Sequence, residues 1–348
     1  MLNYKLKLNR HSNRGFTIVE LLVVIVVIGI LAAITIVSYT GISKRATVAS
    51  LQSDLENASK QLKIDQVIND TFPSTLALAN GGKGIQASAD TTYQYATMNT
   101  NPPSFCLTAT KNSIDYRITN NSSPVAGDCS DYGLALYLDA GNSLSYPGSG
   151  TTWTDLGTNG NNGNLIGGVG YSVDGGGSLN FDGIDDYVNV GNASTVNITG
   201  AITIEVWLKP TSVDGKWCSI ISKSPKTAYF IMQRLASKSI SFGGYFGAIY
   251  KETSISDADI GINTWHHITA TYDGVNTISI YLNGAIKAQN ITVAGNIATT
   301  AEALVIGSSN VSGQRWQGQI SEVRVYSRAL SYAEITRNFN NMRSRFGI

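Results

Sequence analysis

Three aspartates cluster in one short stretch that has the composition of a turn. Asp182, Asp185 and Asp186 lie within the segment LNFDGIDDYVNVG. Carboxylate oxygens at such close spacing are the hard ligands that calcium prefers. The same side chains can instead accept hydrogen bonds from main-chain amides and so shape the turn. The sequence requires no cofactor, and calcium at this turn is the one that it suggests.

The histidines, glutamates and one of the cysteines offer no catalytic arrangement. His266 and His267 are adjacent, so on a strand they point to opposite faces and cannot bind one metal ion together. No neighbour marks the thiol of Cys218 as activated, and it fits the interior of a sheet. Glycoside hydrolysis needs two carboxylates that flank the sugar. The glutamates lie in separate runs, namely at Glu205, Glu252, Glu302, Glu322 and Glu334. We therefore predict that the protein is not an enzyme.

Aromatic rings offer a different chemistry, because a ring can stack on the apolar face of a sugar. In AITIEVWLKP, Trp207 alternates with Ile204, Val206 and Leu208, so it lies on the other face of a half-buried strand. Tyr187 directly follows the aspartate cluster. We predict Tyr187 and Trp207 as stacking surfaces for a ligand, and packing against other residues is the alternative role.

A hydrophobic run near the N-terminus is long enough to cross a membrane. Residues 16–37 are almost wholly apolar, and as a helix they span roughly 33 Å. The basic residues before the run keep the N-terminus in the cytoplasm and send the rest of the chain across. Glu20 lies near the start of the run, where an ionised carboxylate costs several kcal/mol unless it is paired. If the run were only a signal anchor, Glu20 would have no functional role.

The segment RGFTIVELLVVIVVIGILAAI resembles the class III signal of type IV prepilins. The resemblance implies that residues 1–15 are a leader, which a prepilin peptidase removes after Gly15, and that the new amine of Phe16 is then methylated. It also implies that Glu20 pairs with the Phe16 amine of a neighbouring subunit during filament assembly. Many pilins carry a proline within this helix, whereas here Gly29 is the only helix-weakening residue.

The segment that follows the apolar run predicts a small mixed domain. A narrow apolar stripe continues the helix, so that it covers residues 16–70, until Pro73 prevents further helix. The runs TYQYATMN, FCLTATK and IDYRITN predict three short strands. A helix with a small antiparallel sheet is the headgroup pattern of pilins, and we assign residues 71–130 to that sheet.

Three cysteines allow three alternative single bridges in an exported chain. Pilins often close a C-terminal loop with a disulfide, so the resemblance implies a bridge between Cys106 and Cys129. Closure of this loop should stabilise the fold by about 3 kcal/mol. Cys218 is then left as a buried thiol.

Residues 131–348 differ in character, because short alternating strands follow one another with turn signals between them. This pattern predicts a two-sheet sandwich. The segments LNFDGIDDYVNVG, ITIEVWLKP, WHHITATYDG, ISIYLNG and WQGQISEVRVYSRALSYAEI, in this order, resemble laminin-G-like, concanavalin A-like jelly rolls. The resemblance covers about residues 131–342 and implies a module that binds glycans or proteins, sometimes through calcium. Family members often have an acid where this chain has Ser321.

Together these features predict an α+β protein: a transmembrane helix and small sheet followed by an all-β jelly roll. We expect a type IV pilin-like filament subunit that displays a lectin-like domain for adhesion or ligand recognition. The alternative is a structural pilin or secretion-type pseudopilin whose jelly roll is an inert spacer or docking module. Expected partners are other pilin subunits, the prepilin peptidase, the inner membrane, and a glycan or cell-surface protein. The formal net charge of +1 implies no nucleic acid. The precursor should be a single-pass protein of the cytoplasmic membrane with its C-terminus outside, and the mature form should be on a pilus or at the cell surface.

Overall fold

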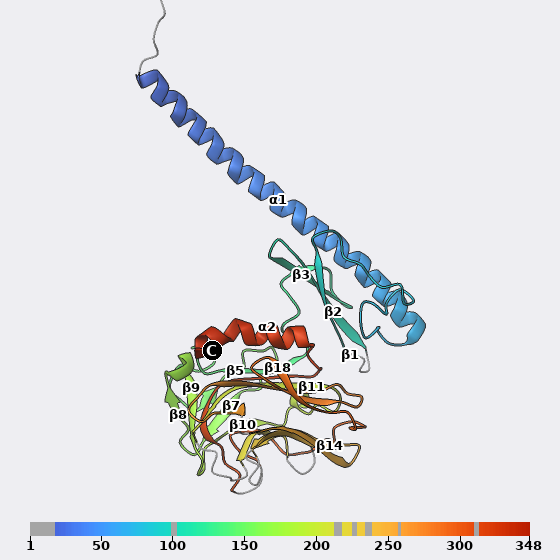
Figure 1. The fold of residues 1–348 in the computed structure, drawn as a ribbon, viewed down its shortest axis with the longest axis vertical. Helices are drawn as coiled ribbons and strands as arrows, with labels where there is room; N and C mark the ends of the chain where they lie inside the picture. Colours follow the sequence, from blue (N-terminus) through green and yellow to red (C-terminus); the bar gives the residue numbers. More distant parts are fainter. Residues whose placement is uncertain are drawn as a thin grey trace, which may run out of the picture.

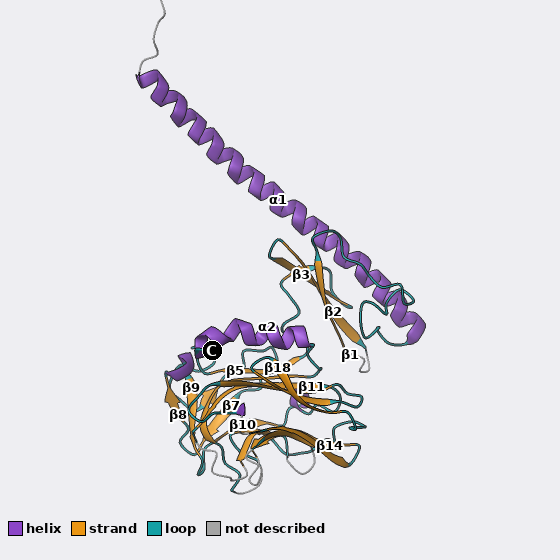
Figure 2. Cartoon of the chain, in the orientation of Figure 1, coloured by secondary structure: helices purple, strands orange, loops and turns teal. Residues whose placement is uncertain are grey.

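The computed structural model describes residues 18–98, 103–211, 218–224, 228–233, 239–256, 259–309 and 313–348. Figure 1 shows a long helix, a small sheet packed near its far end, and a large β-sandwich beyond that sheet. Gly15 and Phe16, together with the predicted leader, lie outside the described residues. Figure 2 shows the same arrangement by element type, with one helix before the small sheet and another beside the sandwich.

The long helix α1 (Ile18–Asn69) is continuous over 52 residues. Its first part, up to Ala46, makes no core with the rest of the chain, and its described side chains are exposed there. From residue 21 onward it is long and apolar enough to cross a membrane. Within this part the hydroxyl of Thr35 donates a hydrogen bond to the carbonyl of Leu31, at 2.9 Å, so the polar group of this side chain is satisfied inside the helix.

The small sheet packs on the second half of α1. Its antiparallel strands are β1 (Thr92–Met98), β2 (Ser104–Lys111), β3 (Ile114–Thr119) and β4 (Val125–Ala126), in that order. The first three are the predicted strands, and β4 was not predicted. Leu51, Leu55 and Leu62 are fully buried in one cluster with Phe105 and Leu107 of β2. The apolar stripe of the helix is therefore covered by the sheet, as its spacing required.

The sandwich has two sheets, which we call the near sheet and the far sheet by their distance from α2 (Tyr332–Met342) in Figure 1. The near sheet contains, in spatial order, β18 (Ala285–Asn290), β17 (Ile278–Leu282), β16 (His266–Tyr272), β11 (Ile202–Pro210), β20 (Gln317–Tyr326), β9 (Ser178–Asp182) and β8 (Gly170–Ser172), with β5 (Leu134–Asp139) paired to β20. The far sheet contains β15 (Ile249–Ile255), β14 (Ile240–Phe246), β13 (Tyr229–Gln233), β12 (Cys218–Ser222), β19 (Leu304–Ile306), β10 (Tyr187–Gly191), β7 (Gly163–Ile166) and β6 (Thr152–Trp153). Short 3-10 helices occur at η1 (Asp174–Gly176), η2 (Ser194–Val196) and η4 (Arg343–Phe346).

The core of the sandwich lies between the two sheets. Ile204 and Val206 of β11 point into it, as their alternation predicted, and meet inward residues of the far sheet in one large buried cluster. Trp153 and Trp316 are fully buried in the same cluster. The paired strands of the sandwich are antiparallel; some are consecutive in the chain, as from β12 to β15, and others lie far apart in sequence, as β5 and β20 do, which fits a jelly roll.

The helix α2 covers the outer face of the near sheet. It begins with a capping box, in which Ser331 accepts from the Glu334 amide and the Glu334 carboxylate accepts from the Ser331 amide. Phe339 of α2 and Phe346 of η4 then pack on Trp207 of β11, with ring centroids 5.8 and 4.0 Å from that of the indole. This C-terminal cover was not predicted from the sequence.

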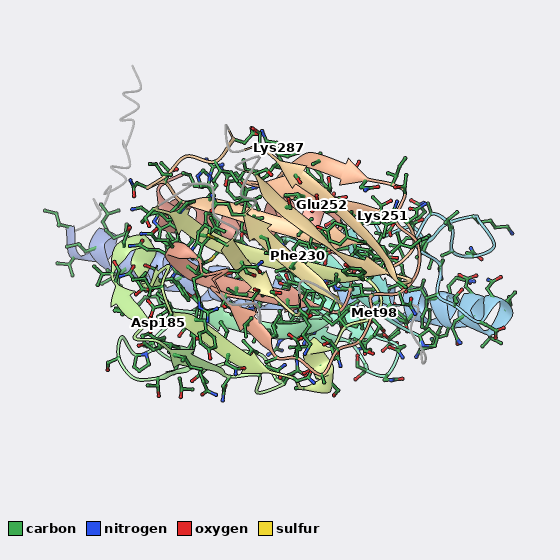
Figure 3. The ribbon with its side chains drawn as sticks, turned by 90° about the horizontal axis from the view of Figure 1, so that it is seen from below. Met98, Asp185, Phe230, Lys251, Glu252 and Lys287 are labelled. Atoms are coloured by element: carbon green, nitrogen blue, oxygen red, sulfur yellow. A yellow bond between two sulfur atoms is a disulfide. The ribbon has the colours of Figure 1, made fainter. Side chains whose placement is uncertain are left out.

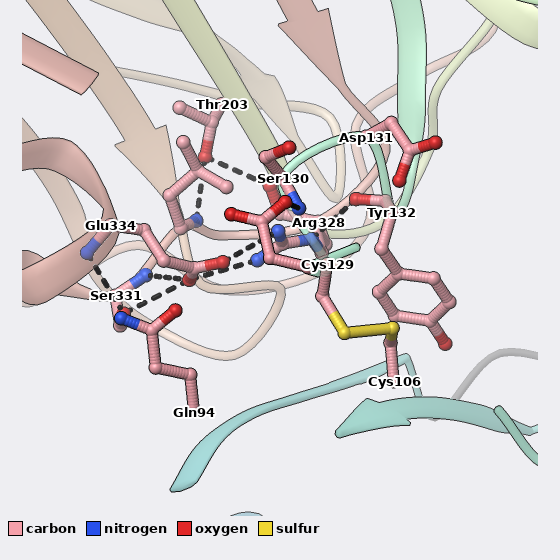
Figure 4. Close-up of polar contacts among 12 residues, drawn as sticks. Gln94, Cys106, Cys129, Ser130, Asp131, Tyr132, Thr203, Arg328, Ser331 and Glu334 are labelled. Atoms are coloured by element: carbon pink, nitrogen blue, oxygen red, sulfur yellow. Dashed lines mark hydrogen bonds and ion pairs between the residues drawn. A yellow bond between two sulfur atoms is a disulfide. The ribbon is translucent and has the colours of Figure 1, made fainter. Parts of the chain in front are cut away.

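A joint of polar contacts and one disulfide connects the small sheet to the sandwich (Figure 4). Cys106 of β2 and Cys129 form the disulfide, which is the predicted pair. Arg328, fully buried just after β20, donates to the Tyr132 carbonyl at 2.6 Å and makes a two-pronged pair with Glu334 at 2.7 and 3.0 Å. The short connection between the two domains is therefore fixed at Cys129 by the disulfide and at Tyr132 by the hydrogen bond from Arg328.

A second contact of the joint comes from α2. Arg337 donates to the Gln94 side chain of β1 at 2.5 Å and lies 3.2 Å from a carboxylate oxygen of Asp128. The C-terminal helix thus contacts the small sheet as well as the sandwich.

Candidate functional site

The predicted aspartate cluster is assembled at one end of the sandwich. Asp182 ends β9, and Asp185 and Asp186 precede β10, so one tight turn brings the three carboxylates together. One ligand oxygen from each lies within 4.8 Å of the others. In Figure 3 the labelled Asp185 lies at the end of the sandwich opposite Met98, which marks the joint with the small sheet.

The same aspartates also shape their turn, which was the alternative role. Asp186 accepts from the Asp182 amide at 3.0 Å, and Asp182 accepts from the Ile184 amide at 2.8 Å. Burial raises the pKa of Asp186, and the nearby negative charges of Asp182 and Asp185 raise it further. Turn shaping uses only part of the oxygen atoms of the cluster, so it does not exclude a cation.

Of the two predicted stacking residues, Tyr187 lies at the surface and Trp207 does not. Tyr187 is half-buried on the far sheet, with the Arg315 guanidinium 5.1 Å from its ring centroid. Trp207 is only 1% exposed, because α2 and η4 cover it. The prediction of Trp207 as a ligand surface is therefore wrong. Alternation placed it on the outer face correctly, but it could not show that another element covers that face.

The residues beneath α2 form a buried polar layer that the sequence did not reveal. Glu205 of β11 accepts from Asn338 of α2 at 2.9 Å and lies 3.8 Å from the Nε2 atom of His267. Glu322 and Arg324 of β20 form an ion pair at 2.9 Å in the same layer. A signal for α2 was present, since Ser331 and Glu334 have capping-box spacing and Ile335 and Phe339 are four residues apart.

The electrostatics of this layer follow from its burial. Burial raises the pKa of Glu205 to about 7, although Arg324 acts against this rise. Burial lowers the pKa of His267 to about 3, with a further contribution from Arg324, so the imidazole is neutral. His266 lies on the opposite face, where its ring contacts the Gly261 carbonyl at 3.0 Å, as expected for adjacent strand residues. Glu205 and Glu322 are closed to solvent, at 2% and 3% exposure.

Replacement of Glu205 by glutamine should change the pH dependence of stability. The folded state raises the pKa of Glu205 to about 7, so its stabilising contribution is present below about pH 4.5 and is lost as the pH rises through 7. Glu205→Gln keeps an oxygen that can accept the hydrogen bond from Asn338. It removes the negative charge that Glu205 carries at high pH beside Glu322, Arg324 and neutral His267. We expect the variant to be more stable than the parent by about 2 kcal/mol at pH 8 and equal to it at pH 5. Thermal melting of the full chain in detergent, followed by tryptophan fluorescence, measures this, and a parallel shift at both pH values would contradict it.

Glu20, the predicted assembly residue, lies near the start of α1. The backbone of Glu20 belongs to the helix, and its side chain lies outside the described side chains. The predicted roles of Gly15, Phe16 and Glu20 therefore stay predictions. Cys218 is buried at the start of β12, outside the disulfide, as expected.

Comparisons with known proteins match two separate parts of the chain. Residues 10–36 match a family model described as the prokaryotic N-terminal methylation motif, and residues 181–336 match the concanavalin A-like lectin/glucanases superfamily. The type II secretion system core protein G of Klebsiella michiganensis is 34% identical over 68 residues, which are 20% of this chain and 48% of that protein. The chain thus spans about half the length of this curated relative.

Solved structures resemble the sandwich in fold alone. The binding domain of Paraclostridial Mosquitocidal Protein 1 has a TM-score of 0.51 at 15% identity, over 61% of this chain and 53% of that one. The binding domain of botulinum neurotoxin serotype G has a TM-score of 0.50 at 17% identity, over 61% of this chain and 51% of that one.

The motif and the apolar helix indicate a membrane-anchored precursor and a place on a pilus or a secretion-related surface. The chain therefore joins the N-terminal methylation motif of type IV pilins and pseudopilins to a concanavalin A-like, lectin-like sandwich.

Proposed function

We propose that the protein is a filament subunit whose sandwich recognises a glycan or a cell-surface protein. The observation that carries the proposal is the joint, which holds the sandwich on the small sheet so that the far sheet faces away from α1 (Figure 1). A subunit built into a filament through α1 then presents the far sheet outward.

The exposed part of α1 supports the assembly half of the proposal. Its apolar side chains between residues 18 and 35 are uncovered by the rest of the chain. Such a surface is stable only in lipid or against other apolar helices. Before assembly the membrane covers it, with the C-terminal domains outside, and in the filament neighbouring subunits cover it. Cleavage after Gly15 by the prepilin peptidase separates these two states.

An aromatic group on the far sheet, of which Phe230 is labelled beside Glu252 in Figure 3, supports the recognition half. Tyr250 of β15 is 39% exposed, and its ring centroid lies 5.4 Å from that of Tyr245 and 6.2 Å from that of Phe230. The hydroxyl of Tyr250 donates to the Glu252 carboxylate at 2.5 Å, which holds the ring in place. A fixed exposed ring beside a carboxylate suits a sugar, since the ring stacks on its apolar face and the acid accepts from its hydroxyls. This group takes the place that the sequence assigned to Trp207.

We further propose that the sandwich binds its ligand without chemical change. What supports this is that the carboxylates Glu205 and Glu322 are buried, at 2% and 3% exposure, and that Glu205 accepts a hydrogen bond from Asn338 of α2.

A glycan array probed with the mature chain in detergent tests the recognition surface. We expect the parent to bind, and Tyr250→Ala to bind about tenfold more weakly, which corresponds to the loss of one stacked ring. Tyr171→Ala is the matched control, because Tyr171 is similarly exposed, at 37%, but lies on edge strand β8 of the near sheet. Equal loss in both variants, or no binding by the parent to glycans or whole cells, would overturn the recognition proposal.

The second candidate function is that of a pseudopilin with the sandwich as a spacer or docking module. It is favoured by the relative at the N-terminus, which is a type II secretion system core protein. The glycan and cell-binding measurements separate the two, because a spacer binds no surface ligand.

A further inference from the structure

We propose that the near sheet carries a peptide-binding pocket for an arginine followed by an aromatic residue, which the RSRFGI segment (residues 343–348) fills in the structure. The pocket has a cradle of oxygen atoms that holds the guanidinium of Arg345 and an aromatic wall that holds the ring of Phe346. It lies beside α2 on the near sheet, whereas the aromatic group proposed for glycan recognition lies on the far sheet. The proposal therefore goes beyond the recognition function and does not depend on any glycan.

The cradle matches the planar shape of a guanidinium. Nη1 of Arg345 donates to both carboxylate oxygens of Asp139, at 2.8 and 3.0 Å, and Nε donates to the Gly175 carbonyl at 2.7 Å. Nη2 donates to the hydroxyl of Ser321 at 2.7 Å and to the Gly177 carbonyl at 3.1 Å. All three nitrogens are thus used. Arginine has such a planar fork of donors, whereas lysine has a single nitrogen, so the cradle selects arginine.

Contacts outside the RSRFGI segment hold the cradle in place. Asp174 accepts from Lys209 at 2.7 Å and from the indole of Trp265 at 3.3 Å, which fixes η1 and its carbonyl groups. The carboxylate of Asp139 accepts from the Gly141 amide at 2.9 Å. Because these contacts do not involve Arg345, the cradle keeps its shape when the guanidinium leaves. A preformed site of this kind binds a ligand without the cost of ordering its own groups.

The ring of Phe346 fills the aromatic half of the pocket. Its centroid lies 4.0 Å from that of Trp207, with an angle of 12° between the planes, and 4.9 Å from that of Trp265. An aromatic residue directly after the arginine therefore contacts two indoles at once. This differs from the sugar-stacking role predicted for Trp207, since Phe339 of α2 also covers that indole.

The backbone of the RSRFGI segment forms hydrogen bonds within the segment. The amides of Gly347 and Ile348 donate to the carbonyls of Ser344 and Arg343, at 3.4 and 3.2 Å. The buried Nε1 atom of Trp207 has no hydrogen-bond partner among the described residues, so the segment leaves one donor beside the pocket unused. A buried donor without a partner costs free energy. A free peptide with the same two side chains can therefore compete for the pocket.

The partner that fits this pocket is a protein segment in which an aromatic residue directly follows an arginine. In the structure the RSRFGI segment competes with such a partner, because its connection to α2 gives it an effective concentration that is roughly millimolar. The pocket is therefore closed to weak ligands. It opens to a partner segment that binds more tightly than the RSRFGI segment.

The test measures binding of a fluorescently labelled peptide with the sequence MRSRFGI to the full mature chain in detergent, by fluorescence anisotropy. Arg345→Ala combined with Phe346→Ala empties the pocket and leaves the carboxylate of Asp139 without its cation. We expect this double variant to bind the peptide at least about tenfold more tightly than the parent, in which the segment competes. The peptide should also raise the melting temperature of the double variant.

Changed peptides show which chemistry the pocket selects. A peptide with Arg345→Lys keeps the charge but loses the planar fork, and one with Phe346→Ala loses the ring. Each should bind the double variant at least about tenfold more weakly than the unchanged peptide. Equal binding of the lysine peptide would show attraction between charges alone and would overturn the pocket.

Two further variants of the chain complete the test. Arg345→Lys in the chain weakens the hold of the segment with the smallest change, so this variant should bind the peptide more tightly than the parent. Arg343→Ala is the matched control, because Arg343 is an exposed arginine of the same segment, and it should bind as the parent does. Equal binding by the parent and the double variant would contradict the proposal. Failure of both the double variant and Arg345→Lys to fold would also contradict it, because the segment would then be a fixed part of the sandwich.

Discussion

Arg328→Met should weaken the attachment of α2 and of the joint by about 3 to 5 kcal/mol, the usual cost of an unpaired buried charge. Arg328 is fully buried, and its guanidinium holds both oxygens of Glu334 and the carbonyl of Tyr132. Methionine fills similar space but leaves the Glu334 carboxylate without its cation. Hydrogen exchange of the α2 amides in the full chain measures the effect, since opening of this helix exposes them.

The pH dependence of the same variant gives a second measure. Burial tends to raise the pKa of Glu334, but the hydrogen bonds and charge of Arg328 outweigh it, so the pKa lies below its ordinary value. The pair therefore stabilises the fold above about pH 4.5, and this contribution is lost as the pH falls through the lowered pKa. Exchange protection of α2 should decrease in acid in the parent and should change much less in Arg328→Met.

Two controls show whether the ion pair is responsible. Arg328→Met combined with Glu334→Gln removes the buried charge and should recover part of the lost protection. Arg343→Met changes an exposed arginine at the end of α2 and should have little effect. If the double variant were as unstable as the single one, packing of the Arg328 side chain and not its charge would be the cause.

Glu20→Leu should leave the protein processed and inserted in the membrane while its incorporation into filaments falls at least about tenfold. The single subunit gains from loss of a carboxylate in lipid, whereas the assembling subunit loses the pair with the Phe16 amine of its neighbour, and a broken pair of this kind costs several kcal/mol. Comparison of sheared filaments with the membrane fraction measures the ratio. Glu20→Asp, which retains the charge, is the matched control and should incorporate better than the leucine variant. Parental incorporation of Glu20→Leu would disprove the assembly role of this acid.

Local patterns explain the parts of the structure that the sequence predicted. The stripe of Leu51, Leu55 and Leu62 predicts a helix that needs a cover, and the adjacent strands supply it. Alternation in β11 predicts which residues enter the core of the sandwich. In both cases the signal and the structure lie within one element, whose repeat of 3.6 or 2 residues sets the direction of each side chain.

Only the tertiary structure decided what lies on the outer face of the near sheet. Alternation along β11 determined that the side chains of Glu205 and Trp207 point away from the core. It could not show which distant segment of the chain covers them. The partners are Asn338, 133 residues from Glu205, and Phe346 of η4, which stacks on Trp207. Arg345, near the C-terminus, likewise reaches Asp139 across 206 residues. The sequence by itself determined the signal for export, the long helix, the first three strands of the small sheet and the two faces of β11, because these depend on neighbours within a few residues. The joint and the buried layer depend on long-range packing, in which segments far apart in the chain exclude water together.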